Sequence, residues 1–181
     1  MRTVLWLCLL FQVGALAETP TVAERLQEAA KHSAEMYEVS RGDRAYWINY
    51  RYPAATADQL RRYWDLRPWE YRLRHDQEPR PWPTLADAPA LRELVERADP
   101  ELRSLAISAL STLEQPEDIP RIAAVLGDDR LGVPALRHCL FSKIHVQKEA
   151  QNLGLQMDMI WEKRTLNDYA GEALRYMTEG D

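Results

Sequence analysis

The sequence has few of the residues that build cofactor sites and disulfide frameworks. Its 181 residues include seven glycines, four histidines and two cysteines. It contains no glycine-rich phosphate-binding loop, no haem-attachment motif and no strained serine turn of the hydrolase type. The histidines lack the spacing of a metal-ligand set. We therefore expect no cofactor, no metal site and no catalytic residues, and we predict that the chain is not an enzyme.

Long apolar runs are lacking after the first seventeen residues, which have the layout of a secretory signal. Arg2 supplies a positive start, Val4 to Val13 is almost entirely apolar, and Ala15 and Ala17 are small residues where a signal peptidase reads. The mature chain is then expected to begin at Glu18 and to be periplasmic or secreted, with no stable membrane insertion. The alternative is an uncleaved amphiphilic anchor.

Positive charge is also in deficit. Loss of Arg2 with the leader leaves 22 basic against 28 acidic residues, a net charge of −6. Such a chain is a poor general binder of nucleic acid, because neutralising phosphates supplies most of the non-specific affinity. Cys8 leaves with the leader, so Cys139 stands alone and cannot form an intramolecular disulfide. A lone cysteine is buried, reactive or bridged to another chain, and we favour a buried Cys139.

Helical periodicity is present in the first half of the mature chain. A helix is predicted over 20–39, capped by Thr19 or Thr21, and a second one from Thr56 through Trp64. Prolines crowd the stretch 67–89, which predicts an extended connection there. No segment alternates with a period of two, so no strand is expected.

The second half repeats one helical pattern in three stretches, Asp99–Leu113, Asp129–Lys143 and Thr165–Met177. Small or apolar residues recur at equivalent positions of the three: Ala106, Ala109 and Leu110; Leu136, Cys139 and Leu140; Ala170, Ala173 and Leu174. Partner helices are predicted over 90–98, 119–126 and 144–161. Asp99 is expected to cap the helix that begins at Pro100, and Gly127 to end the helix over 119–126. Repeats of this length indicate stacked helix pairs.

These segments resemble the HEAT-repeat family, especially its branch with units of about 30 residues. The residues that carry the resemblance are 99–110, 118–129 and 165–174, and it extends over residues 85 to 178. It implies a curved helical scaffold that binds other macromolecules. Helical-repeat hydroxylases of this branch hold two irons through His-Glu pairs, which this chain lacks, so that activity does not transfer.

The predicted fold is all-α, with three parts. Residues 1–17 form the leader, 18–84 an aromatic-rich helical cap, and 85–181 a short α-solenoid of about three helix-pair repeats. Because so few repeats are near the minimum for a stable stack, a homodimer through the open end at Leu174 and Met177 is compatible with the sequence.

Aromatic residues and arginine are concentrated between residues 37 and 82, where six tyrosines and four tryptophans lie among nine arginines. These rings either cover the exposed end of the repeat stack or form a surface that grips sugars or peptides. The candidate surface residues are Trp47, Tyr50, Arg62, Tyr63, Trp64 and Trp69. We predict an exported, non-catalytic scaffold for protein–protein interaction. The alternative is a carbohydrate or cell-wall binding protein that uses 37–82, with a glycan as its partner.

Overall fold

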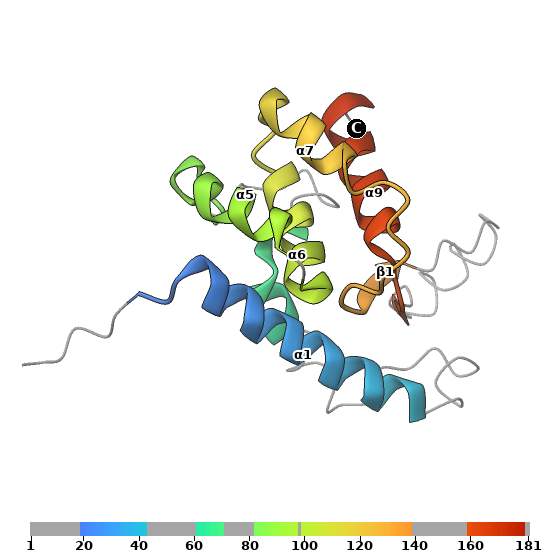
Figure 1. Cartoon of the computed structure of the whole chain (residues 1–181). Helices are drawn as coiled ribbons and strands as arrows, with labels where there is room; N and C mark the ends of the chain where they lie inside the picture. Colours follow the sequence, from blue (N-terminus) through green and yellow to red (C-terminus); the bar gives the residue numbers. More distant parts are fainter. Residues whose placement is uncertain (1–18, 43–60, 71–81, 98, 139–158, 180–181) are drawn as a thin grey trace, which may run out of the picture.

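The computed structural model describes residues 19–42, 61–70, 82–97, 99–138 and 159–179 (Figure 1). The predicted leader, Glu18 and Cys139 lie outside these ranges. These described residues are mostly helical, which confirms the predicted class. The elements are α1 (Val22–Gly42), η1 (Leu85–Asp87), α5 (Ala88–Glu96), α6 (Pro100–Ser111), η2 (Pro116–Asp118), α7 (Ile119–Ala123), β1 (Ala135–His138), β2 (Met159–Glu162) and α9 (Leu166–Glu179). Residues 61–66 and 68–70 are also helical. Among the described residues, no helix combines the length and apolarity needed to cross a membrane.

Helix α1 begins at a reciprocal cap formed by Thr21. The hydroxyl of Thr21 accepts the amide N–H of Glu24 at 3.2 Å, and the Glu24 carboxylate accepts the Thr21 N–H at 2.8 Å. The Thr21 N–H and the Thr21 hydroxyl both donate to the Glu24 carboxylate, and these hydrogen bonds lower the pKa of Glu24. Of the two predicted caps, Thr21 is therefore the correct one. The predicted apolar stripe is buried at Leu26, Ala29, Ala30, Ser33 and Met36.

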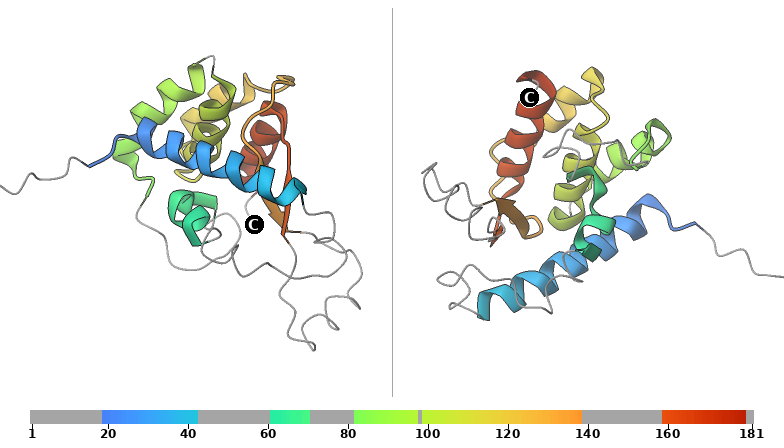
Figure 2. Two further views of the ribbon diagram at one scale, coloured as in Figure 1. Left: turned by 90° about the horizontal axis from the view of Figure 1, so that it is seen from below. Right: turned by 180° about the vertical axis from the view of Figure 1, so that it is seen from behind.

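Helix α6 lies at the centre of the described residues. As predicted, Asp99 caps it, accepting the N–H of Glu101 at 3.0 Å, and Pro100 occupies the first turn. Every residue from Ser104 to Ser111 is buried, and several are alanine or serine, so neighbouring elements approach α6 on several sides. Helices α1, α5 and α9 all contact it. Figures 1 and 2 show α6 between α5 and α9, with α1 lying across them.

The helices after α6 form a second packed pair. Helix α7 follows η2, and the turn after it ends at Gly127, whose φ of 83° is the left-handed conformation that stops a helix. Helix α7 packs against α9 and also contacts α5, while α9 packs against α6. The chain between α7 and α9 carries both strands.

Two predictions of regular structure are wrong. The helix predicted over 129–143 is not formed in its described part, where residues 135–138 are β1. The helix predicted over 144–161 is likewise replaced at 159–161 by β2, which pairs with β1 in antiparallel register, Ala135 opposite Glu162. Val133 precedes Pro134, and a residue before proline disfavours helical backbone. Pro134 therefore disfavours the first turn of the helix that the repeat pattern predicted over 129–143.

The extended connection predicted over 67–89 is also wrong in part. Residues 68–70 and 85–87 are helical, and Pro89 lies in the first turn of α5. Proline is tolerated there because the first-turn N–H has no partner within the helix. Helix α5 thus begins at Ala88, two residues before its predicted start.

The loop before β1 presses against α6 at a glycine. The Ser104 hydroxyl donates to the carbonyl of Glu101 at 2.7 Å and accepts the N–H of Val133 at 3.1 Å. A Cβ added to Gly132 would lie 2.4 Å from Cβ and 2.6 Å from Oγ of Ser104. Only glycine fits this approach, because Ser104 sits on the fixed backbone of a buried helix.

We predict that Gly132→Ala lowers the free energy of unfolding by about 1–3 kcal/mol, because the added methyl group forces α6 and the loop apart. The matched control is Gly171→Ala on α9, where an added Cβ meets nothing within 4 Å. This control should stabilise the protein by roughly 0.5–1 kcal/mol. Urea unfolding followed by circular dichroism measures both. Equal stabilities for the two variants would contradict the close approach.

Candidate functional site

Two of the predicted surface residues are accessible. Arg62 is exposed and forms an ion pair with Glu28 of α1. Trp64 is half-buried, and its ring meets that of Tyr63 edge-to-face at 5.0 Å between centroids. Trp47 and Tyr50 lie outside the described residues. Arg62 and Trp64 therefore remain available for contact with a ligand.

Tyr63 and Trp69, two of the candidate surface residues, do not lie on a surface, because both side chains have 0% exposure. The Trp69 ring packs against that of Trp82 at 5.0 Å, and both belong to the hydrophobic core that contains Leu26 and Leu91. The Arg25 guanidinium covers the Trp82 ring at 4.3 Å. Aromatic rings bury a large apolar area, and here they fill the core where α1 meets the helices that follow.

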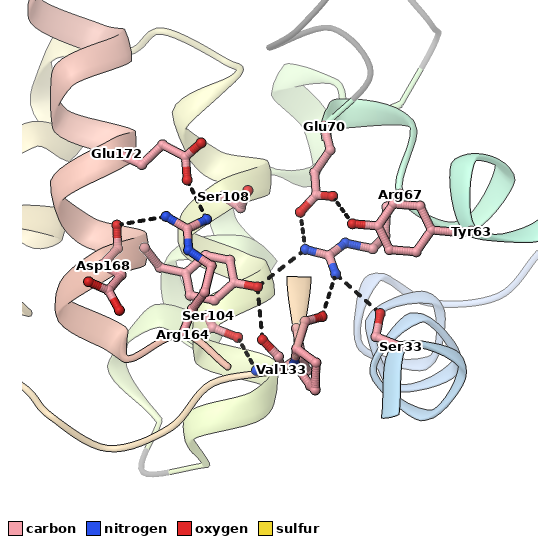
Figure 3. Close-up of polar contacts among 12 residues, drawn as sticks. Ser33, Tyr63, Arg67, Glu70, Ser104, Ser108, Val133, Arg164, Asp168 and Glu172 are labelled. Atoms are coloured by element: carbon pink, nitrogen blue, oxygen red, sulfur yellow. Dashed lines mark hydrogen bonds and ion pairs between the residues drawn. The ribbon is translucent and has the colours of Figure 1, made fainter. Parts of the chain in front are cut away.

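The most unusual group in the described residues is a buried arginine, Arg67, with 0% exposure (Figure 3). Its Nη1 donates to the hydroxyl of Ser33 at 3.1 Å and to the carbonyl of Pro134 at 3.4 Å. Its Nη2 forms an ion pair with Glu70 and donates to the hydroxyl of Tyr169 at 3.4 Å. One guanidinium thus joins α1, residues 61–70, the loop before β1, and α9.

Two tyrosines complete this network. Tyr63 donates its hydroxyl hydrogen to the second carboxylate oxygen of Glu70. Tyr169 donates to the carbonyl of Val133 at 3.0 Å while it accepts from Arg67. The Glu70 carboxylate is therefore occupied by a guanidinium and a phenol, and its side chain is 5% exposed. The Arg67 Nε is buried without a hydrogen-bond partner, whereas both of its terminal nitrogens and both Glu70 oxygens are engaged. With solvent excluded, the network positions backbone segments.

A second buried arginine supports the other side of Tyr169. Arg164 is 4% exposed, forms an ion pair with Glu172, and donates to the carbonyl of Asp168 at 3.3 Å. Its guanidinium lies 4.8 Å from the centre of the Tyr169 ring. Tyr169 is thus held between two guanidinium groups, one at its hydroxyl and one on its face. This arrangement fixes the first half of α9.

A buried carboxylate links the two helix pairs. Asp118, at 0% exposure, accepts from Nε of Arg92 at 2.7 Å and from Nη1 of Arg121 at 2.9 Å. The hydrogen bond from Arg92 to Asp118 raises the pKa of Arg92. The same two arginines reach exposed carboxylates of Glu117 and Glu96. These contacts join α5 to η2 and α7, so they also serve packing.

The end of α7 is joined to the start of α9 at a junction that we define as residues 127–131 and 165–167. The N–H of Leu166 donates to the carbonyl of Arg130, and the N–H of Asn167 to that of Asp128, both at 2.9 Å. Leu131 and Thr165 form an antiparallel bridge. The first residues of α9 therefore lie beside the residues that follow α7, although the two segments are more than thirty residues apart in the sequence.

Asp128 in this junction is strongly stabilised as an anion. Hydrogen bonds from the side chain and backbone of Arg130, together with the charge of Arg103, lower its pKa from 3.8 to about 2. The Arg130 guanidinium binds the carboxylate at 2.7 Å, and that of Arg103 lies 3.5 Å away on α6. The Asp128 carboxylate therefore ties the turn to the first part of α6.

In the part of the chain that the structure describes, no group of three or more histidine, cysteine, aspartate or glutamate side chains could hold a metal ion. His32 is buried in α1 at 5% exposure. The side chains of the other histidines lie outside the described residues.

No family model matches the sequence, and neither the curated proteins nor the solved structures contain a significant match.

Sequence reasoning did not single out Arg67 and Glu70, which it counted only as members of a charged, aromatic segment. A usable signal was present. Arg67 and Glu70 are opposite charges three residues apart, and Tyr63, Trp64 and Trp69 surround them in the sequence. Charges spaced in this way between large apolar rings are candidates for a buried pair.

We predict that Arg67→Met destabilises the protein by about 3–5 kcal/mol, because it leaves the Glu70 carboxylate buried without a counterion. Arg67→Met combined with Glu70→Gln should recover more than about 1 kcal/mol of this loss, since no unpaired charge then remains. Arg62→Met removes an exposed pair and should change stability by less than about 1 kcal/mol. Chemical denaturation of the three variants provides the measurement. A double variant no more stable than Arg67→Met would contradict the assigned role.

We predict an acid-sensitive contribution to stability from Asp128. Because folding lowers its pKa, this contribution is complete above about pH 4 and is lost as the pH falls towards 2. Asp128→Asn and Arg130→Gln should each flatten the dependence of stability on pH in that range, by about 0.5–1 kcal/mol at this partly exposed site. Thermal unfolding between pH 2 and 6 tests this. A wild-type slope in Asp128→Asn would refute the assignment.

Proposed function

We propose that the chain is an exported helical-repeat scaffold that binds a protein partner and has no catalytic role of its own. The observation that carries the proposal is the pairing of the helices. Helix α5 packs against α6, α7 packs against α9, α6 contacts α9, and α5 contacts α7. Two stacked helix pairs make these four contacts, and stacked pairs present extended surfaces to partners.

In this proposal α9, rather than residues 129–143, supplies the second helix of the second unit. The direct hydrogen bonds between 127–131 and 165–167 support it, because they bring the start of α9 to the end of α7. The repeat pattern supports it as well. Ala106 and Ala109 of α6 correspond to Ala170 and Ala173 of α9, and all four are at most 3% exposed. Residues between the two halves of the junction, including β1 and β2, would then be an insertion in the second unit.

The aromatic segment is proposed to cap the first unit. Helix α1 contacts both α5 and α6, and the core that contains α6 also contains Trp69 and Trp82. A terminal repeat needs such a cover because it lacks a neighbour on one side. The burial of Trp69 and of Tyr63 therefore favours the capping interpretation over a ligand surface for these two rings.

The far end of the stack presents polar residues. The outward positions of α9 are Asp168, Gly171, Arg175 and Thr178, all exposed. Leu174 and Met177 are partly buried against the core instead. A polar outer face is the usual form of a terminal repeat, so a homodimer through Leu174 and Met177 has little support.

Carbohydrate binding remains the alternative proposal, but fewer of the candidate residues now support it. Among the described residues, the exposed Arg62 and the half-buried Trp64 are the two candidate residues that a glycan could reach. An aromatic ring and a guanidinium are each a reasonable sugar contact.

The proposal is tested by expressing the full chain with its leader and a C-terminal tag in its source cells. After chemical cross-linking, one protein should be recovered at a fixed ratio from the cell envelope or medium, with both wild type and Trp64→Ala. Loss of the bound protein or glycan only in Trp64→Ala would favour the alternative. Absence of any stoichiometric protein in the wild-type sample would refute the scaffold function.

The same purification tests export. The mass of the recovered chain should correspond to a start at Glu18, because the leader is removed during secretion. A chain that retains Met1 in the cytoplasm would refute the localisation.

A further inference from the structure

Two large apolar side chains stand exposed at the junction between α7 and α9. Leu126 and Leu131 are each 50% exposed, and they flank residues 127–130. The remaining large exposed apolar side chain in the described residues is Leu85, at 62%, in η1. A single exposed leucine needs no explanation. Two exposed leucines that flank one ordered turn are less common, and their exposure suggests a contact with another molecule.

The turn that carries these leucines is fixed by the protein. The N–H of Gly127 donates to the side chain of Asn167 at 2.9 Å, and the carbonyl of Arg130 accepts from α9. Leu131 itself is in the bridge with Thr165. The leucines are therefore presented on ordered backbone, so a partner would lose little conformational entropy of this segment on binding.

Three exposed carboxylates at the junction and on the neighbouring first turn of α6 have no ion pair within the described residues. Asp129 is exposed, and no basic side chain of the described residues pairs with it. On the first turn of α6, the exposed Asp99 and Glu101 likewise have no ion pair within the described residues. The ion pair between Arg103 and Asp128 joins this turn to the junction. The nearby guanidinium groups of Arg103 and Arg130 are both engaged with Asp128.

We propose that Leu126 and Leu131, together with Asp99, Glu101 and Asp129, form a docking surface for a partner segment that carries apolar side chains flanked by lysine or arginine. The apolar side chains would cover the two leucines, and the basic ones would meet the carboxylates. A second copy of this chain is a poor occupant, because its own junction would bring like charges together. This inference rests on the proposed scaffold function and specifies the chemistry of the partner.

The test uses purified full chain and two fluorescent synthetic peptides with identical leucines, one with lysines and one with glutamates between them. The lysine peptide should bind, and its affinity should fall as salt is raised, whereas the glutamate peptide should not bind. Leu126→Ser combined with Leu131→Ser should weaken binding at least tenfold, and Asp129→Lys should weaken it several-fold. Leu85→Ser is the matched control and should bind like the wild type. Fluorescence anisotropy measures binding, and circular dichroism verifies folding.

Several outcomes would overturn the docking surface. These are no binding of the lysine peptide, equal binding of the glutamate peptide, or unchanged binding by the double serine variant. Self-association that the double variant abolishes would identify a second copy as the occupant instead. A partner recovered from cells equally well by the double variant and wild type would overturn this surface but leave the scaffold function standing. Absence of any partner in the wild-type experiment would refute the scaffold function itself.

Discussion

The described fold depends on the compensation of one buried positive charge. Removing a guanidinium from water costs several kcal/mol, and Glu70 alone does not satisfy its donors. The remaining acceptors that bind Arg67 come from Ser33 on α1, Pro134 before β1 and Tyr169 on α9. Because these contacts are far apart in the sequence, the charge is satisfied only when all of these segments are in place. The ion pair thus makes α1 and residues 61–70 dependent on the loop before β1 and on α9.

The second constraint is the small side chains of α6, which set how closely other elements approach it. Gly132 lies so close to Ser104 that no Cβ would fit between them. The Ser104 hydroxyl also accepts a hydrogen bond from the N–H of Val133. This contact places the loop that continues into β1. On the same helix, Arg103 reaches Asp128. The position of the exposed junction is therefore a consequence of packing around α6.

Local signals in the sequence predicted most helix boundaries well. The cap at Asp99 and the stop at Gly127 each depend on a few neighbouring residues, so they can be recognised without knowing the fold. The strands could not be predicted in this way, because β1 has no alternating pattern and forms by pairing with residues about twenty positions away. Composition also placed Trp69 among the surface candidates and counted Arg67 only as one of nine arginines in the segment. Their burial depends on contacts with α1 and α9, which no local window contains.

Burial and ion pairing distinguish the side chains that stabilise the fold from those that are exposed to solvent. Arg67, Arg92 and Arg164 bind carboxylates and carbonyls of this chain, so they have little capacity left for a ligand. The same holds for the rings of Tyr63 and Trp69, which lie within the core. Within the described residues, Leu126, Leu131 and Asp129 are exposed on ordered backbone at the junction. In the proposed binding role, such groups would select a partner by shape and by charge. The proposed binding role is therefore assigned to exposed side chains at the junction and not to the buried arginines and aromatic rings.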